Sequence, residues 1–515
     1  MAKYKLKLWF SNAEATLSKL SVSCLSPRAG GYLIAIFALI TYAVDYWEPS
    51  FFIWDEAYHI ASAEKYLNGT YFMELHPPLG KLVIAAGEVL LRANPRNDHF
   101  LSVLANEDYA GEFSFVGYRL FPVVFAVLAA LLLYELFLRL FHRCEWAILL
   151  TFLYVFDNAL IVQSRIAVLE STQICFVIAT LLCGLALCQS VSRKAQIHWA
   201  ARLGCAFALA LATKVTSLFL LPGAGALLWC LRRKRAGILG PSVVCGSAFF
   251  LVYAAVWYTH FFIATSVNPE LKSIGFLDTR PATQELLVRH ESDQIENLPI
   301  MYAEALHFFA NYNLGLPVVN LCGGSEMGSP PYFWPLGART IPYHAEDEDE
   351  YYTSRYIYLQ VNPMVWLCSL VGVLTSSALL FGAVCFGLWK KLPHRGALLI
   401  FLMLYWGYMG AMLAVPRVMY LYHYLIPLIL GMILFATVLS QISRIGPFDF
   451  SLDRQTKFLR VVSILVITCF IFYSPLSYYQ RLSRNEVAAR AWFPLWDLYC
   501  RGCSRTKFLA FPLSN

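Results

Sequence analysis

The sequence predicts an all-α polytopic membrane protein. Of its 515 residues, 58% are hydrophobic and 14% are charged, whereas soluble domains carry about 25% charged residues. The apolar residues form many runs of about 18 residues or more, the length that an α-helix needs to cross a bilayer. Because helices satisfy all their backbone polar groups internally, such runs favour membrane-spanning helices. We expect about 11 transmembrane helices with outward-facing loops.

The expected spans follow the apolar runs in order. They cover residues 31–48, 116–138, 146–163, 171–190, 203–213, 215–231, 238–263, 362–389, 396–414, 418–440 and 460–475. The arm before them is too long and polar for a typical cleaved signal peptide, so the first span is expected to be retained. The expected organisation is an N-terminal arm 1–30, a core 31–263 with a first loop 49–115, a loop 264–361, the spans 362–475 and a tail 476–515.

The positive charges predict the orientation of these spans. Lys and Arg gather in the N-terminal arm and in alternate connections such as Arg139–Arg143, Arg232–Arg235 and Lys390–Arg395. The positive-inside rule makes that side cytoplasmic. The first loop, the 264–361 loop and the tail then face outward. The net charge of +7 therefore reflects topology, and no nucleic-acid partner is expected.

Two further features of the sequence, a pair of cysteines and a run of acidic residues, are not interpreted as functional sites. Cys500 and Cys503 form a single C-x-x-C pair, which is a weak zinc signal, so we expect a local disulfide or no bond. The acidic run His344–Glu350 is expected to be a solvated loop.

The first loop contains the stretch WDEAYHIASAEKYLNGTYFMELHPPLGK, in which Asp55 and Glu56 are adjacent. Ionisable residues at membrane edges are costly and often functional. Adjacent carboxylates point in different directions, so one could act as a base while the other orients. Trp54 and Tyr58 would raise the pKa of such a carboxylate. The alternative is that Asp55 caps a short helix over residues 57–67.

The same stretch ends in a turn built on His76, Pro77, Pro78 and Lys81. The two prolines force a rigid, extended conformation and exclude a helix through the turn. The flanking His and Lys could meet a phosphate or a hydroxyl, or the turn could simply frame the loop.

Further charged residues are expected at the outer ends of the spans. Arginine binds phosphate through a planar fork of donors, so a cluster of arginines near carboxylates suits an anionic lipid phosphate. The alternative is a set of structural ion pairs, and Lys214 could either bind phosphate or snorkel. The candidates are Arg119, Arg165, Glu170, Lys214 and Arg417, with His423 in the same segment as Arg417.

Four segments resemble the protein O-mannosyltransferase family. They are DEAYH…KYLNGTYFMELHPPLGKL in the first loop, FDNALIVQSRIAVLES (Phe156–Ser171), NPMVW (Asn362–Trp366) and PRVMYLYHYLIP (Pro416–Pro427). They occur in the family's order over residues 50–430. The resemblance also implies the GT-C superfamily of polyprenyl-phosphate-sugar glycosyltransferases, which includes aminoarabinose transferases.

The resemblance implies an inverting glycosyltransferase. Such an enzyme takes a sugar, commonly mannose, from a polyprenyl monophosphate and transfers it to a Ser or Thr hydroxyl of secreted proteins. It implies that Asp55 is the general base with Glu56 beside it, and that Arg119 and Arg165 are the family's two arginines. The acceptor protein could be presented by the secretion machinery. No obligatory metal or cofactor is predicted, although a divalent ion is not excluded.

Departures from the family pattern leave alternatives open. Glu170 and Glu74 stand where the family has Asp, and the 264–361 loop is too short for a β-trefoil insertion. A bacterial-type member in the cytoplasmic membrane, with an outward-facing site, is therefore expected. The same fold could act on a lipid or cell-wall glycan. A lipid-linked-sugar transporter and a non-catalytic relative are further alternatives.

Overall fold

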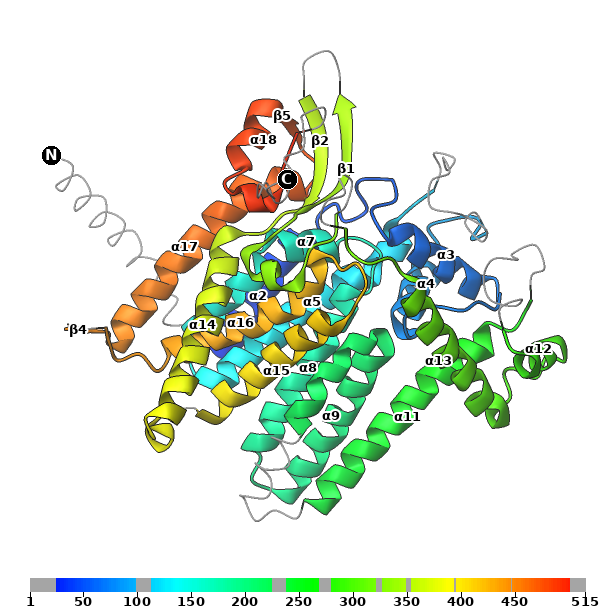
Figure 1. Cartoon of the computed structure of the whole chain (residues 1–515), viewed down its shortest axis with the longest axis horizontal. Coiled ribbons are helices and arrows are strands. Elements are labelled where there is room, and N and C mark those ends of the chain that lie inside the picture. The colour runs from blue at the N-terminus through cyan, green and yellow to red at the C-terminus, as the bar shows by residue number, and fades with distance from the viewer. Residues whose placement is uncertain are drawn as a thin grey trace, which may run out of the picture.

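The computed structural model in Figure 1 describes residues 25–98, 113–224, 238–267, 279–320, 327–348, 353–392, 395–445 and 447–500. It is a mostly helical membrane protein. Seven of the described helices are long and apolar enough to cross a bilayer. They are α5 (Val116–Phe141), α8 (Glu170–Gln189), α11 (Leu239–Ile263), α14 (Pro363–Cys385), α15 (Arg395–Ala414), the unit of η7 (Leu421–Tyr424) with α16 (Leu425–Leu439), and α17 (Leu452–Ser477).

An eighth span is broken between α6 (Cys144–Val155) and α7 (Asn158–Ser164), which bend by 65°. The break is stabilised by Asp157, which caps α7 by accepting a bond from the Leu160 amide (2.9 Å) and accepts another from Trp366 Nε1 (3.1 Å). The polytopic class is thus confirmed. The count of 11 stays a prediction, because seven or eight spans meet the criteria of length and hydropathy among the described residues.

Helix boundaries differ from the expected ones where polar residues start or end a helix. The first apolar unit combines α2 (Pro27–Ala38) with the π-helical η2 (Leu39–Ala43), and it begins where Ser26 caps the Ala29 amide. Helix α9 (Arg193–Thr213) starts ten residues before the expected 203, because Ser192 caps its polar first turn. The 3₁₀ helix η3 (Val215–Leu220) follows, and residues 225–231 of the expected sixth span lie outside the described residues.

The predicted loops contain regular structure. The first loop forms α3 (Glu56–Leu67) and α4 (Leu79–Leu91), and the 264–361 region forms α12 (Pro281–Val288), α13 (Leu298–Gly315) and η5 (Pro331–Leu336). Strands β1 (Ile341–Glu348), β2 (Thr353–Leu359) and β5 (Arg481–Ser483) make an antiparallel sheet in the order β1-β2-β5, followed by α18 (Arg484–Arg490). Shorter elements are η4 (Ile295–Asn297), η6 (Trp389–Lys391), β3 (Arg444–Ile445), β4 (Phe448–Asp449) and η8 (Pro494–Trp496).

The acidic run predicted to be a solvated loop is partly strand. Residues His344–Glu348 belong to β1 and pair with β2 in a register that runs from Ile341–Leu359 to Glu348–Thr353. Residues 349–350 lie outside the described part of the chain. Cys500 is disulfide-bonded, whereas the predicted partner Cys503 lies outside the described residues.

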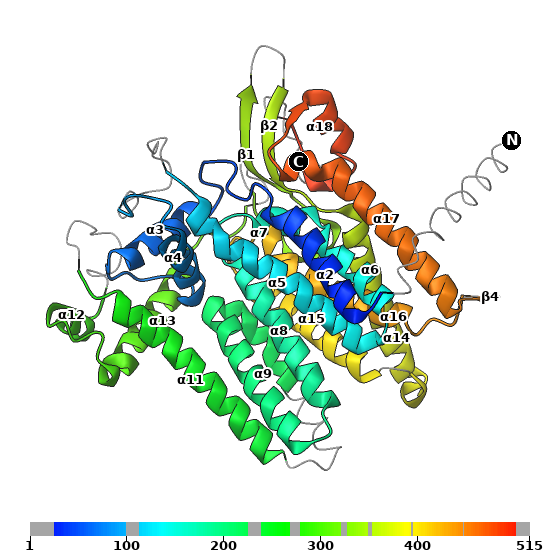
Figure 2. The ribbon, with the colours of Figure 1, turned by 180° about the vertical axis from the view of Figure 1, so that it is seen from behind.

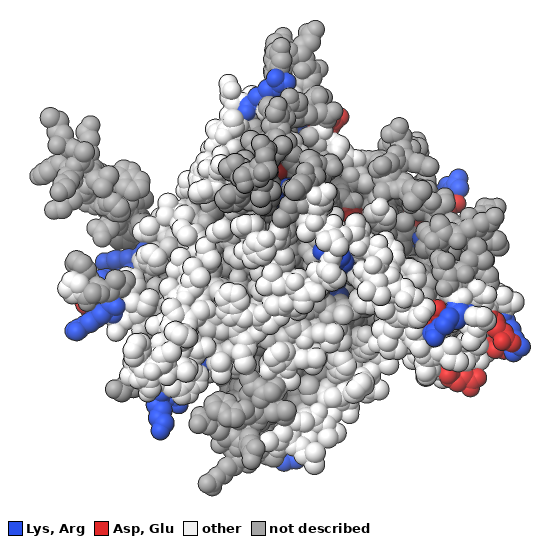
Figure 3. Space-filling view, in the orientation of Figure 1, with Lys and Arg blue, Asp and Glu red and all other residues white. Residues whose placement is uncertain are grey.

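The elements outside the spans lie at several places around the bundle of helices. The β1–β2 hairpin lies at the top in Figure 1 and in the view from behind (Figure 2), whereas α3 and α4 lie at the right in Figure 1 and at the left from behind. Figure 3 shows Lys, Arg, Asp and Glu mainly around the edges, while the broad middle of this face is almost free of charge. Charge exclusion from the middle is expected where lipid covers the spans.

Two glycines let the first loop pack closely on a span. A Cβ added to Gly87 of α4 would lie 2.2 Å from the carbonyl oxygen of Gly117 in α5, so only glycine permits this helix crossing. The close crossing fixes α4, and with it the turn that precedes α4, against the start of α5.

Candidate functional site

The site is centred on Asp55, immediately before α3. Trp54 has φ 54°, an uncommon left-handed conformation for a bulky residue that marks a constrained backbone. Asp55 occupies the N-cap position of α3, but its side chain makes no capping bond. The capping alternative is therefore wrong for this side chain. Its Oδ2 instead accepts a hydrogen bond from the Tyr422 hydroxyl (3.3 Å).

The surroundings of Asp55 make its carboxyl a weak acid. Burial, followed by the nearby carboxylate of Glu170, raises its pKa to about 6. Lys214, the Tyr422 hydroxyl and Arg417 oppose this increase in pKa. A carboxyl with a pKa close to the working pH is suited to general-base catalysis, since it is ionised at neutral pH yet is a stronger base than an ordinary aspartate.

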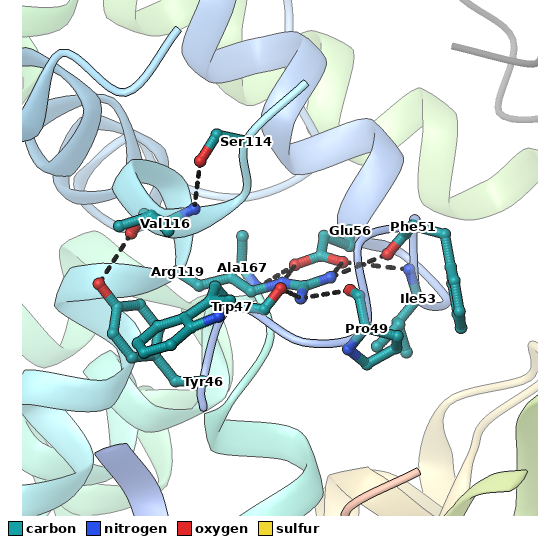
Figure 4. A network of polar contacts seen from close by, with 10 residues as sticks. All are labelled: Tyr46, Trp47, Pro49, Phe51, Ile53, Glu56, Ser114, Val116, Arg119 and Ala167. Carbon is teal, nitrogen blue, oxygen red and sulfur yellow. Dashed lines mark hydrogen bonds and ion pairs between the residues drawn. The ribbon is translucent and has the colours of Figure 1, made fainter. Parts of the chain in front are cut away.

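Glu56 lies in a completely different environment, shown in Figure 4. It is fully buried and forms a two-bond ion pair with Arg119, in which Nε to Oε1 and Nη2 to Oε2 are both 2.7 Å. The amides of Ile53 (3.1 Å) and Ala167 (2.7 Å) also donate to this carboxylate. Glu56 therefore joins the start of α3 to α5 and to the segment after α7.

Arg119 uses all five of its N–H groups inside the protein. Besides Glu56, it donates to the carbonyl oxygens of Trp47, Pro49 and Phe51, each at 2.8 Å (Figure 4). An arginine has five donors in total, so none is left for a phosphate. We correct the prediction that Arg119 binds the donor: it holds the chain between the first span and α3.

Arg165, like Arg119, connects separate elements of the fold. It donates to the carbonyl oxygens of Val44 (2.6 Å) and Asp45 (2.7 Å), and its guanidinium lies 4.7 Å from the ring of Tyr478. These contacts tie the end of α7 to the end of the first span. These two bonds use two of the five N–H groups of Arg165, so its predicted contact with the donor stays a prediction.

Glu170 and Lys214 form an ion pair at a small cavity. Lys214 Nζ lies 2.5 Å from Glu170 Oε1 and 5.5 Å from the centre of the Tyr422 ring. Gln173 of α8 donates to Thr216 (2.8 Å) and Ser217 (2.9 Å), which holds the α9–η3 junction against α8. The structure thus brings together Asp55, Glu170, Lys214 and Tyr422.

Arg417 reaches the same cluster from the segment after α15. Its charge lowers the pKa of Asp55 and of His76, which places it near both. Arg417 is half-buried, and no hydrogen bond or ion pair joins it to another residue in the described part of the chain. Its guanidinium is therefore available to an anion.

His423 forms part of the cavity wall. Its ring stacks on Tyr422, with ring centres 4.4 Å apart, and its Nδ1 lies 3.1 Å from the Tyr420 carbonyl oxygen. Its predicted contact with the donor is untested.

The His-Pro-Pro turn frames the cluster. Pro78 occupies the N-cap position of α4. Fully buried Lys81 pairs with Glu74 (2.5 Å), which also accepts a bond from Ser62, so the turn is tied to α3. Burial, followed by Lys214 and Lys81, keeps the pKa of His76 well below its usual value, so His76 is a neutral imidazole rather than a cation.

Other residues at the site gave little signal in the sequence. The buried Trp54 Nε1 and His59 Nδ1 have no hydrogen-bond partner among the described residues. The Trp54 ring lies 5.3 Å from the rings of both Tyr343 and Tyr420. Only the spacing of His59, one helical turn after Asp55, could have indicated its place, whereas Tyr343 comes from a strand almost 300 residues away.

Metal ligands were not expected. Within the described residues, no group of three or more His, Cys, Asp or Glu side chains is arranged to hold an ion. The expectation that no metal is obligatory stays a prediction.

The fold and site define a class, namely integral membrane proteins with a carboxylate and cation cluster at one end of the spans. Comparison with known families makes this class specific. Residues 32–266 match the family described as dolichyl-phosphate-mannose-protein mannosyltransferase. Residues 312–496 match the C-terminal four-transmembrane region of protein O-mannosyltransferase. The chain belongs to the protein O-mannosyltransferase family.

Individual relatives agree with this assignment. The chain is 32% identical over 124 residues to protein O-mannosyltransferase 1 of Drosophila melanogaster, a match that covers 24% of this chain and 14% of that protein. It is 27% identical over 131 residues to mannosyltransferase 6 of Candida albicans, covering 25% of this chain and 15% of that protein. These alignments span only about one seventh of the relatives' length.

A solved structure shares the fold over nearly the whole chain. The Saccharomyces cerevisiae Pmt1–Pmt2 complex bound to the sugar donor superposes with a TM-score of 0.73 and 14% identity, covering 94% of both chains. The likeness at this identity concerns the fold.

Proposed function

We propose that the protein transfers a sugar, mannose by analogy with its family, from a polyprenyl monophosphate to a Ser or Thr hydroxyl of a protein. The observation that carries the proposal is the part-exposed Asp55 carboxyl, with a pKa raised to about 6, beside the cations Lys214 and Arg417.

The chemistry follows from this arrangement. Ionised Asp55 accepts the proton of the acceptor hydroxyl as its oxygen attacks the anomeric carbon from the face opposite the phosphate, which inverts that centre. The bond from the anomeric carbon to the phosphate oxygen breaks, and the polyprenyl phosphate leaves with the electron pair. Lys214 and Arg417 stabilise the negative charge on the leaving phosphate. Glu170 holds Lys214 in place, and Tyr422 orients Asp55.

Supporting residues form the walls of the site. The rings of Trp54, Tyr343 and Tyr420 provide flat apolar surfaces, and sugar rings commonly pack against such surfaces through their C–H faces. Glu56 and Arg119 take no part in the chemistry in this account: they set the position of Asp55. We place the reaction on the outward side of a membrane, following the distribution of Lys and Arg.

A transfer assay tests the proposal. Purified protein is incubated with a panel of polyprenyl-phosphate sugars, a Ser/Thr peptide and a lipid acceptor, and both acceptors are analysed by mass spectrometry. A hexose added to the peptide, present with wild type and absent with Asp55→Asn, is expected. A hexose found only on the lipid would overturn the protein acceptor, and transfer by Asp55→Asn at the wild-type rate would overturn the base.

A further inference from the structure

A second concave surface lies away from the proposed active site. It is a groove of about 810 Å³ between α3, α4, α5 and α11, a volume in the range typical of ligand sites. Its walls are apolar, with contributions from Leu82, Val89, Phe121 and Ile263. The hydroxyl of Tyr66, which also lines the groove, is bonded to His260 Nδ1 (2.7 Å). Arg92 is the charged residue of the lining.

Helix α4 is built with its charges inside and its apolar residues outside. Lys81 is 0% and Glu88 is 1% exposed, whereas Val89 is 58% and Leu90 is 65% exposed. A helix in contact with water has the opposite arrangement. The exposed apolar face of α4 therefore fits a lipid environment.

The groove lies at the depth where lipid headgroups meet acyl chains. Phe121 is in the second turn of α5, and Ile263 is the last residue of α11, so the groove is at the ends of two spans. Arg92 follows the last residue of α4 in a left-handed conformation (φ 50°) and is exposed. An arginine at this boundary keeps its charge among headgroups and attracts anionic lipid.

We propose that this groove binds an acyl chain of an anionic membrane phospholipid, with Arg92 contacting its phosphate. The site is distinct from the proposed donor site. No residue lines both the groove and the cavity at Glu170. Asp55 and Tyr66 are at opposite ends of α3, about 16 Å apart along the helix axis. The bound lipid would anchor α3 and α4 at the membrane surface.

Lipid retention tests the proposal without reference to transfer activity. The purified full chain is equilibrated with micelles containing equal amounts of dioleoyl phosphatidylglycerol and dioleoyl phosphatidylcholine, repurified, and its retained lipids are counted by mass spectrometry. Wild type is expected to retain phosphatidylglycerol in preference to phosphatidylcholine. Ala86→Trp fills the groove from an exposed position, so it should fold normally and lose most of the retained lipid.

The charge is tested separately. Arg92→Gln should still retain lipid but reduce the preference for phosphatidylglycerol by about fivefold. Two matched controls should behave as wild type. One is Leu251→Trp at a position on α11 that is 72% exposed and not part of the groove lining, and the other is Arg96→Gln at an exposed arginine paired with Asp98 (2.9 Å).

Three outcomes would overturn the proposal. The first is wild-type retention by Ala86→Trp with an unchanged melting temperature. The second is displacement of the retained phosphatidylglycerol by added polyprenyl phosphate, which would assign the groove to the donor's tail. The third is a change of oligomeric state in Ala86→Trp without loss of lipid, which would assign the groove to a second copy of the chain.

Discussion

Asp55 and Glu56 are consecutive residues, yet they have opposite environments. The carboxylate of Glu56 is fully buried and receives four hydrogen bonds from Arg119, Ile53 and Ala167. That of Asp55 is part-exposed and accepts one long bond from Tyr422. Because successive helical residues point about 100° apart, the start of α3 directs one acid into the protein and the other into the site.

The comparison shows that charged side chains in this fold are of two kinds: those fully paired within the protein and those left incompletely paired. The pairs that are fully satisfied, such as Glu56 with Arg119, connect elements and leave no donor for a ligand. The groups left incompletely satisfied among the described residues, Asp55 and Arg417, are those to which we assign contact with substrate in the proposed function. Satisfied buried networks rigidify a structure, whereas incompletely paired groups concentrate at functional sites.

The largest expected effect comes from breaking the buried pair. Arg119→Ala leaves the Glu56 carboxylate buried without its partner, which should cost about 3–5 kcal/mol of stability. A thermal unfolding transition should fall steeply or disappear. Arg96→Ala, which breaks an exposed pair worth about 0–1 kcal/mol, is the control. Equal melting temperatures for the two variants would contradict the structural role of Arg119.

Lys214 should matter for donor binding as well as for stability, because its partner Glu170 is also buried. Lys214→Met removes the cation that pairs with Glu170 at the cavity. Affinity for polyprenyl-phosphate sugar should fall by about tenfold or more, the value of a charge-assisted hydrogen bond. Titration of the donor by competition measures this affinity. An unchanged affinity would remove Lys214 from the phosphate site.

Arg417 is less buried, so its substitution should have a smaller effect. Arg417→Ala should raise the apparent KM for the donor by about fivefold, equivalent to about 1 kcal/mol for a part-exposed cation. Arg417→Lys keeps the charge and should retain most of the affinity. If both variants bind donor as wild type does, Arg417 has no role at the phosphate.

The smallest effect concerns pH. Since Asp55 must be ionised to accept a proton and its pKa is about 6, activity should decline as pH falls through about 6. The Glu170 carboxylate raises this pKa, so Glu170→Gln should move the decline to lower pH. A pH–rate profile of both proteins checks the direction. A shift to higher pH would contradict the proposed electrostatic coupling.

The sequence was informative about the spans because a long apolar run reports a helix able to cross a bilayer, whether lipid or protein surrounds it, as for the almost wholly buried span Leu421–Leu439. The sequence was less informative about helix boundaries where polar residues enter a helix, as after Ser192 at the start of α9. It also did not reveal that one span breaks at Asp157. The small sheet was not foreseen, since the acidic residues of β1 concealed a strand whose partner, β2, follows later in the chain and in turn pairs with β5. Strand pairing depends on such distant contacts, which local patterns do not report.

The types of residue at the site could be predicted from the sequence. Which of them connect elements of the fold and which remain available to a ligand could not. Arg119 was expected at the donor phosphate because arginine suits phosphate. Its actual partners are Glu56 and three backbone carbonyls, and backbone carbonyls carry no sequence signal. Likewise, the orphaned Nδ1 of His59 and the left-handed Trp54 are consequences of tertiary packing. Only a three-dimensional arrangement separates an acid that is paired from an acid that is free.

The paired variants Asp55→Asn and Glu56→Gln test the central claim most directly, by single-turnover transfer and thermal unfolding at pH 7. A carboxyl whose pKa is raised on folding opposes folding when it is ionised, so removing its charge does not destabilise the protein. Asp55→Asn should therefore lower turnover by about 10²–10⁴-fold with an unchanged or higher melting temperature, whereas Glu56→Gln should lower the melting temperature. Wild-type turnover by Asp55→Asn, or an unchanged melting temperature for Glu56→Gln, would contradict the account.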